Sequence, residues 1–145
     1  MSGLAELAAF QWPLRVYIED TDAGGIVYYV NYLKYIERAR TEFLRSLGFG
    51  KQAIFNTDLM FVVRAVTSEY LKPAQLDDEL IATVAVVETG RVFLVMEQCV
   101  YRTTGHHLAE ESELLFKAEV KLACVDKKSI KPQRIPMDMI ASINK

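Results

Sequence analysis

The sequence predicts an α+β domain in which one long helix packs against an antiparallel sheet of about five strands. Two observations carry this prediction. A single long segment shows the periodicity of a helix, and several segments rich in Val, Phe, Leu and Tyr have the composition of strands. Because one helix covers only one face of such a sheet, we expect the other face to pack against a partner.

Length and composition indicate a single domain over residues 1–145, since 51% of the residues are hydrophobic and 25% are charged. Residues 1–12 are expected to form an N-terminal extension, either a short packing helix or a loose segment. Residues 137–145 are expected to form a C-terminal tail with one or two helical turns. Neither end shows the composition of a second core.

The first strand is expected over Leu14–Glu19, where apolar and polar residues alternate. The long helix follows over Asn31–Leu47, whose apolar residues recur at helical spacing. Asn31 is a favourable N-cap, and Gly48 stands where a left-handed residue often ends a helix. The two capping residues therefore define both ends of the predicted helix.

Four further segments have the composition of strands. They are Met60–Leu71, Leu80–Glu88, Val92–Arg102 and Glu113–Val125. The connections between them contain turn-forming residues, namely Asp77-Asp78, Thr89-Gly90-Arg91 and Thr104-Gly105-His106. We therefore expect consecutive strands to pair as antiparallel hairpins.

Charge and residue usage exclude several function classes. Seventeen basic and nineteen acidic residues without a basic block argue against a nucleic-acid partner. No apolar stretch reaches the roughly 18 residues of a membrane helix, so we expect no membrane anchor. Cys99 and Cys124 fit free thiols in a cytoplasmic protein, and His106 and His107 lack further ligands at metal-binding spacing. We expect no metal.

The most informative segment is the loop Asp20-Thr21-Asp22-Ala23-Gly24-Gly25, which leads into the start of the helix. The free N–H groups of a helix N-terminus stabilise negative charge on a carbonyl oxygen under attack. A nearby carboxylate can act as nucleophile or as base for a water molecule. The thiolate of coenzyme A is a good leaving group because ordinary thiols have a pKa of about 8.5, so hydrolysis of a thioester does not require a strong general acid. We expect such hydrolysis to proceed without an added cofactor. From the residues alone, Asp20 and Asp22 are more readily explained as turn-capping residues than as catalytic ones, because capping is the commonest role of Asp in a loop.

The run Tyr17–Tyr29, followed by Asn31-Tyr32 and Glu37-Arg38-Ala39-Arg40, resembles the signature of the 4-hydroxybenzoyl-CoA thioesterase family. The closest branch is that of the Tol-Pal-associated acyl-CoA thioesterases. Glu69–Ala74 and Leu76–Leu80 also resemble the family, so the likeness covers nearly the whole domain. The resemblance implies a hotdog fold, in which the sheet wraps around the helix and active sites form between paired subunits.

The resemblance also implies an activity, the hydrolysis of an acyl-CoA to a carboxylic acid and free CoA. It assigns Asp22 as the catalytic carboxylate and the backbone N–H of Tyr29 as the donor to the thioester carbonyl. The bound acyl group would reach toward the partner subunit. In a hotdog enzyme Arg91 is placed to contact a phosphate of CoA, and Lys72 and Arg64 are weaker candidates. We expect a homo-oligomer, either a dimer or a homotetramer built as a dimer of dimers.

One departure limits the resemblance. Many members of the Tol-Pal branch have His at the position of Tyr29, so a backbone role survives here but an imidazole role does not. Asp20 and Glu19 are expected to shape the loop or to pair with basic neighbours, and Tyr28 and Tyr32 to be core or interface residues.

Two other functions remain open. One is a noncatalytic module that binds acyl-CoA or acyl carrier protein, and the other is a dehydratase, which would need a second proton-transfer group. The acyl chain, the choice between CoA and a carrier protein, and the role of Asp22 as nucleophile or base stay undetermined.

Overall fold

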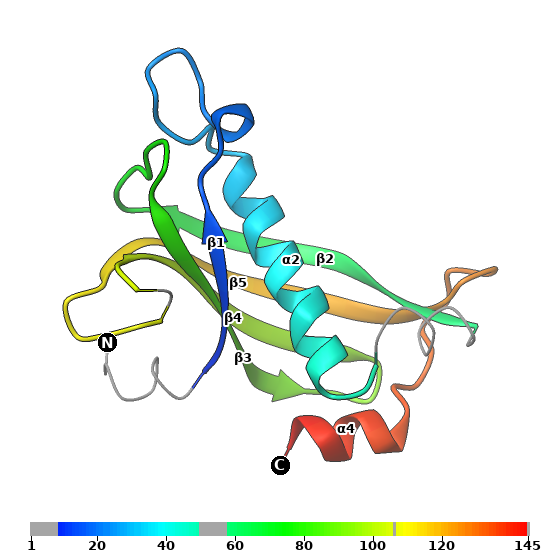
Figure 1. Cartoon of the computed structure of the whole chain (residues 1–145). Coiled ribbons are helices and arrows are strands. Elements are labelled where there is room, and N and C mark those ends of the chain that lie inside the picture. The colour runs from blue at the N-terminus through cyan, green and yellow to red at the C-terminus, as the bar shows by residue number, and fades with distance from the viewer. Residues whose placement is uncertain (1–8, 50–57, 106, 145) are drawn as a thin grey trace.

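The computed structural model describes residues 9–49, 58–105 and 107–144. The strands are β1 (Phe10–Arg15), β2 (Leu59–Tyr70), β3 (Glu79–Thr89), β4 (Phe93–Thr103) and β5 (Glu113–Asp126). The helical elements are the 3-10 turn η1 (Ile18–Asp20), α2 (Asn31–Ser46) and α4 (Met137–Ile143). The five strands form one antiparallel sheet, and α2 crosses one of its faces (Figure 1). The predicted fold class is therefore confirmed.

The order of the strands in the sheet is β1-β3-β4-β5-β2. β3 pairs with β4 and β4 with β5, as predicted for consecutive strands. The prediction is wrong for β2, which pairs with β5 at the far edge instead of with β3. Residues 71–78 therefore form a crossover. Asp77 N donates to Val16 O at 3.0 Å and Val16 N donates to Asp78 O at 3.0 Å, so these turn residues bind the chain after β1.

The first strand is displaced from its predicted position. β1 ends at Arg15, and Ile18–Asp20 is a 3-10 turn, so the expected strand over Leu14–Glu19 is wrong in its second half. Tyr17 and Ile18 are 61% and 75% exposed, and their apolar character therefore does not mark a buried face. β1 starts at Phe10, which places residues 10–12 in the sheet instead of in the predicted extension. Residues 1–8 lie outside the described residues.

The long helix matches its prediction closely. α2 covers Asn31–Ser46, and Gly48 follows it with φ +93°, the left-handed conformation expected of a C-terminal glycine. The N-cap prediction is wrong. Val30 occupies that position without a side-chain hydrogen bond, and the Asn31 side chain turns instead toward Asp20.

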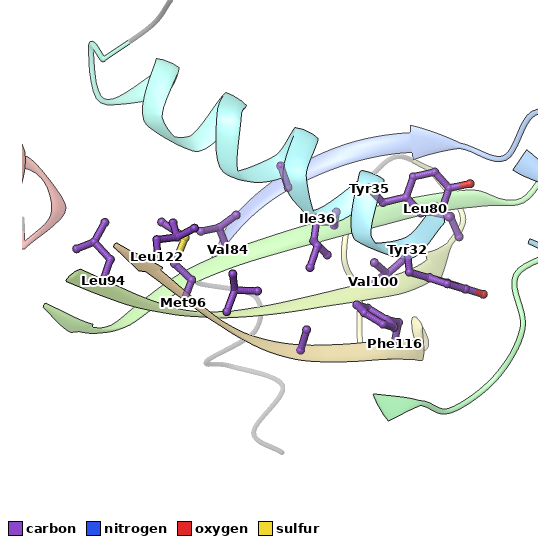
Figure 2. Close-up of a cluster of buried hydrophobic side chains, with 14 of the residues drawn as sticks. Tyr32, Tyr35, Ile36, Leu80, Val84, Leu94, Met96, Val100, Phe116 and Leu122 are labelled. Carbon is purple, nitrogen blue, oxygen red and sulfur yellow. The ribbon is translucent and has the colours of Figure 1, made fainter. Parts of the chain in front are cut away.

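The hydrophobic core lies between α2 and the face of the sheet that it crosses. Figure 2 shows Tyr35 and Ile36 of α2 above Val84, Met96 and Val100 of the sheet, and all five are at most 1% exposed. Burying each such side chain is worth about 1.5–3 kcal/mol. This interface therefore fixes the position of the helix on the sheet.

β2 is the edge strand that α2 leaves largely uncovered. Val66 and Tyr70 of β2 are opposite Val120 and Phe116 of β5, which face the core, so all four share the face on which the helix lies. Val66 and Tyr70 are nevertheless 40% and 46% exposed. The chain thus presents an apolar strip along one edge of its concave face.

The chain ends at the opposite edge of the core. Residues 137–143 form α4, two helical turns in the predicted C-terminal tail, and Met139 is buried. Ile135 N donates to Arg91 O at 2.9 Å, which ties this segment to the turn between β3 and β4. Within the described ranges, no helix has the length and apolar character needed to cross a membrane.

Candidate active site

The loop between η1 and α2 folds back on itself. Thr21 and Val27 form an isolated antiparallel bridge, and Asp22 N donates to Ile26 O at 2.9 Å. Gly25 adopts φ +80°, a conformation that glycine takes without strain, and its N–H donates to Asp22 O at 3.1 Å. The loop that the sequence singled out is therefore a closed turn with Asp22 near its tip.

The Asp22 side chain is exposed on this turn. Its Oδ1 accepts a hydrogen bond from Gly24 N at 2.9 Å, and its Oδ2 forms no hydrogen bond with any described residue. One carboxylate oxygen is thus held in place by the loop while the other is available. Such an arrangement suits a group that must contact water or substrate.

The chain enters α2 through a second turn that leaves donors free. Tyr28 N donates to Asp20 O at 2.9 Å, and Asn31 N donates to Tyr28 O at 2.8 Å. Among the described residues, the N–H groups of Tyr29 and Val30 donate to no acceptor. They precede the first turn of α2, where the helix dipole is positive. These two donors can therefore stabilise a developing oxyanion.

A cavity of about 340 Å³ lies beside these donors. Its walls come from the loop, the start of α2 and the segment that follows β2. The lining residues are Ile26, Val27, Tyr29, Tyr32, Tyr70, Leu71, Lys72 and Pro73. Lys72 is the one charged residue among these described lining residues, so the cavity suits an apolar group with an anionic attachment.

Aromatic side chains form one wall of the cavity. The Tyr29 and Tyr70 rings meet edge to face with centroids 6.0 Å apart, and Tyr32 stacks on Phe116 at 5.1 Å. The Tyr32 hydroxyl accepts a hydrogen bond from Ala74 N at 2.8 Å, and burial raises the pKa of this phenol. Tyr32 therefore supports the wall as a neutral, hydrogen-bonded residue, in agreement with the core role that we expected.

Arg102 stabilises the part of the cavity wall that is formed by residues 71–73, directly after β2. Its Nη2 donates to Pro73 O at 2.7 Å and its Nε pairs with Asp78 at 2.9 Å. Arg102 also pairs with Glu113, whose other oxygen lies 2.8 Å from Lys72 Nζ. The hydrogen bond from Lys72 and the charges of Lys72 and Arg102 hold the pKa of Glu113 below its usual value. Lys72, the one charged residue among the described lining residues, thus belongs to an ion-pair network behind the wall.

The structure does not bring all predicted site residues together. Tyr29 lines the cavity, whereas Asp22 lies on the neighbouring turn outside the lining residues. Arg91 follows β3, whereas the loop contacts the segment that precedes β3, where Ile26 forms a bridge with Gln75. Since a strand rises about 3.3 Å per residue, roughly 30 Å separate the two ends of β3. Arg91 therefore cannot reach the same site within one chain.

The remaining candidate residues are consistent with structural roles. Cys99 and Cys124 are buried, and burial raises the pKa of the Cys124 thiol, which disfavours a nucleophilic thiolate. His107 is exposed, and His106 lies outside the described residues. Within the part of the chain that the structure describes, no cluster of three or more potential metal ligands occurs.

Sequence reasoning missed the contributions of Tyr70 and Arg102 to the site. Tyr70 ends an apolar strand, and the sequence gives no sign that this strand is left uncovered. Arg102 contacts Pro73 across 29 positions of sequence, and only tertiary structure reveals such a contact. The motif Glu69–Ala74 was the one signal that marked this wall.

Comparison with known proteins identifies the family. The family model for the thioesterase superfamily matches residues 24–109, more than half of the chain. The chain is 42% identical over 132 residues to the acyl-CoA thioester hydrolase YbgC of Escherichia coli, covering 91% of this chain and 93% of that protein. It is 41% identical to the acyl-CoA thioesterase YbgC of Haemophilus influenzae, covering 93% and 94% of the two chains.

A solved structure agrees with these relatives. The crystal structure of a probable thioesterase from Bartonella henselae superimposes with a TM-score of 0.73 at 34% identity, covering 88% of this chain and 99% of that one. The family expected from the loop motif is thus confirmed by sequence and by fold. The chain belongs to the thioesterase superfamily, has its hotdog fold and is a thioester hydrolase.

Proposed function

We propose that this enzyme hydrolyses acyl-CoA thioesters to a carboxylic acid and free CoA, with Asp22 as the catalytic carboxylate. The Tyr29 N–H donates to the thioester carbonyl oxygen in this proposal. The observation that carries it is the N–H of Tyr29, which has no acceptor among the described residues and lies at a helix N-terminus beside an apolar cavity. An exposed carboxylate lies on the same loop. The relatives named acyl-CoA thioesterases support the choice of substrate.

Two routes are open to Asp22. As a nucleophile, it forms a C–O bond to the acyl carbon while the C–S bond breaks, and water then hydrolyses the mixed anhydride. As a base, it takes a proton from water, whose oxygen attacks the acyl carbon while the thiolate leaves. Label in the Asp22 carboxylate after a single turnover in ¹⁸O water would establish the nucleophilic route, because the base route leaves both oxygens of Asp22 unchanged.

We propose that the active protein is a homo-oligomer, either a dimer or a homotetramer made of two dimers. The apolar strip of β2, with Val63 49% and Val66 40% exposed, supports this proposal because large exposed apolar surfaces mark association sites. A second copy along β2 would extend the cavity toward the partner. Light scattering after size exclusion tests the state, and a monomer with full activity would contradict the proposal.

The carrier of the acyl group is proposed to be CoA, with acyl carrier protein as the alternative partner. Lys72 supports an anionic carrier because it is the cation at the cavity. Arg91, the residue expected to contact a phosphate, lies at the opposite end of β3, so any such contact in our proposal is made by a second copy of the chain.

A cytoplasmic location is part of the same proposal. Both cysteines are buried thiols that are not joined by a disulfide, which fits a reducing compartment. Coenzyme A esters are also small soluble substrates. Separation of cell fractions followed by detection of the protein tests the location. Recovery in the periplasmic fraction would contradict it.

The first experiment compares the wild type with Asp22→Asn. Release of free thiol is measured with acyl-CoAs of graded chain length and with an aromatic acyl-CoA. We expect Asp22→Asn to lower kcat roughly 100-fold or more, because it removes the charge but keeps the oxygen that accepts from Gly24. Asp126→Asn is the matched control, since Asp126 also accepts hydrogen bonds in an exposed turn, from Ser129.

The outcomes separate the competing functions. An Asp22→Asn variant with wild-type turnover contradicts the catalytic role of Asp22. Tight binding of acyl-CoA without turnover in the wild type would support the noncatalytic module instead. The chain length with the highest kcat/KM defines the substrate class.

A further inference from the structure

Asp20 is a buried carboxylate that the proposed reaction does not use. It is 7% exposed, whereas Asp22, two positions later, is exposed. A charged group is rarely buried unless hydrogen bonds or opposite charge compensate it. The surroundings of Asp20 therefore indicate what its burial achieves.

Each oxygen of the Asp20 carboxylate holds a different part of the chain. Oδ2 accepts a hydrogen bond from Tyr17 N at 2.9 Å, before the loop. Oδ1 accepts one from Asn31 Nδ2 at 2.9 Å, at the start of α2. Asn31 is itself only 6% exposed. We call this arrangement of Asp20, Tyr17 N–H and the Asn31 side chain the Asp20 clamp.

The Asp20 clamp closes the loop that contains both groups of the proposed reaction. The backbone of Asp20 adds a further bond, since its carbonyl accepts from Tyr28 N at 2.9 Å. Asp22 stands two residues after Asp20, and Tyr29 lies between Tyr28 and Asn31, which both bind Asp20. Asp20 therefore acts together with the Thr21–Val27 bridge and the Asp22–Ile26 hydrogen bond to set the position of the carboxylate relative to the Tyr29 N–H.

The negative charge of Asp20 is compensated by its position at the start of α2, where the helix dipole is favourable to an anion. The buried hydroxyl of Tyr35 lies nearby and has no hydrogen-bond partner among the described residues. Burial, and next the charge of Asp20, raise the pKa of this phenol. The Tyr35 phenol is therefore a second polar group enclosed behind the loop beside Asp20.

We propose that Asp20 is a positioning residue that fixes Asp22 and the Tyr29 N–H relative to each other by clamping Tyr17 and Asn31. This inference rests on the proposed function of Asp22 and Tyr29. The inference goes beyond a loop-shaping role for Asp20. It predicts that turnover requires a hydrogen-bond donor at one of positions 20 and 31 and an acceptor at the other. Asp20 itself does not contact the substrate in this account.

A charge swap tests the proposal. Asn31→Asp places two carboxylates where the structure has a 2.9 Å hydrogen bond, and we expect kcat to fall about tenfold or more because small displacements of reacting groups are costly. Asp20→Asn combined with Asn31→Asp restores a donor and an acceptor. We expect this double variant to recover kcat to within about threefold of the wild type.

Two further measurements distinguish positioning from a loss of folding. KM should stay near the wild-type value in Asn31→Asp, because Tyr17, Asp20 and Asn31 are not among the described residues that line the cavity. Asn31→Ala removes the donor without adding charge and should lower kcat severalfold, which keeps the test valid if Asn31→Asp does not fold. Asp126→Asn serves again as the control with unchanged kcat.

Two results would overturn the proposal. One is wild-type kcat in both Asn31→Ala and Asn31→Asp. The other is a double variant whose Tm recovers to the wild-type value while its kcat stays low. Asp22→Asn is measured in the same series. If Asp22→Asn loses activity while the clamp variants keep it, the positioning role fails and the proposed function stands. If Asp22→Asn keeps wild-type activity, the proposed function itself is wrong.

Discussion

The two ends of the sheet differ in what fills them. At the loop end, the buried polar pair Asp20–Asn31 lies behind exposed aromatic residues such as Tyr29, which is 60% exposed. At the far end, near α4, Leu94 and Ile135 are at most 1% exposed and pack in an apolar cluster. The loop end thus combines an apolar core, which includes the buried Tyr35 and Leu80, with directional hydrogen bonds, whereas the far end is held chiefly by hydrophobic burial.

This difference shows how the molecule separates stability from chemistry. Apolar burial stabilises without fixing a geometry, whereas hydrogen bonds fix the positions of particular atoms at a small net gain in stability. We therefore expect substitutions at the far end to act mainly on the free energy of unfolding, and substitutions in the loop to act mainly on the geometry of the site. Regions with few buried apolar contacts are also those that open most easily.

The largest expected effect is a loss of stability from a substitution at the far end. Leu94→Ala removes a fully buried side chain and should lower the free energy of unfolding by about 2–5 kcal/mol. kcat of the folded enzyme should change little, because Leu94 is remote from the cavity. Urea unfolding and thiol release measure the two quantities. The control is Val87→Ala, at an exposed position of β3, and a large loss of kcat in Leu94→Ala would contradict the separation.

A smaller effect concerns the charge at the loop end. Lys72→Gln should raise KM for acyl-CoA roughly fivefold, whereas Glu113→Gln, which frees Lys72, should lower KM. The same acyl group on N-acetylcysteamine, which has no phosphate, serves as the control substrate. Equal changes in KM on both substrates would show that Lys72 does not contact the anionic carrier.

The smallest effect appears at alkaline pH. The pKa values of Tyr32 and Tyr35 are raised in the folded state, chiefly by burial, so their contribution to stability is complete below about pH 10 and is lost as pH rises further. Tyr35→Phe should flatten the fall of the urea midpoint above pH 10, while Tyr17→Phe, at an exposed position, should not. Identical slopes in all three proteins would contradict this assignment.

Most of the fold follows from local sequence. The helix that begins at Asn31 and the strands β2 to β5 were predicted at nearly their observed bounds, because periodicity and turn residues are local signals. β1 was displaced because Tyr17 and Ile18 continue its alternation although a turn begins there. The pairing of β2 with β5 was missed since it joins strands that are distant in sequence.

The site was only partly predictable. The resemblance marked Asp22 and Tyr29, and the structure adds that the Tyr29 N–H is unpaired among the described residues. The role of Asn31 was misread as a helix cap because Asn is a common N-cap, whereas its side chain binds a buried carboxylate. Such a partner cannot be inferred from spacing, since it depends on how the loop closes.

The crossover between β2 and β3 has a consequence for how the chain folds. β3, β4 and β5 are consecutive along the chain, joined by residues 90–92 and 104–112, and can form as a unit. β2, in contrast, leaves the ribosome well before its partner β5, with residues 71–112 still to follow. At roughly 5–20 residues per second, an apolar strand waits for seconds without its neighbour. Closure of the sheet at β2 is therefore expected to be the late step, and the interval before it is the time at which the nascent chain is most prone to aggregate.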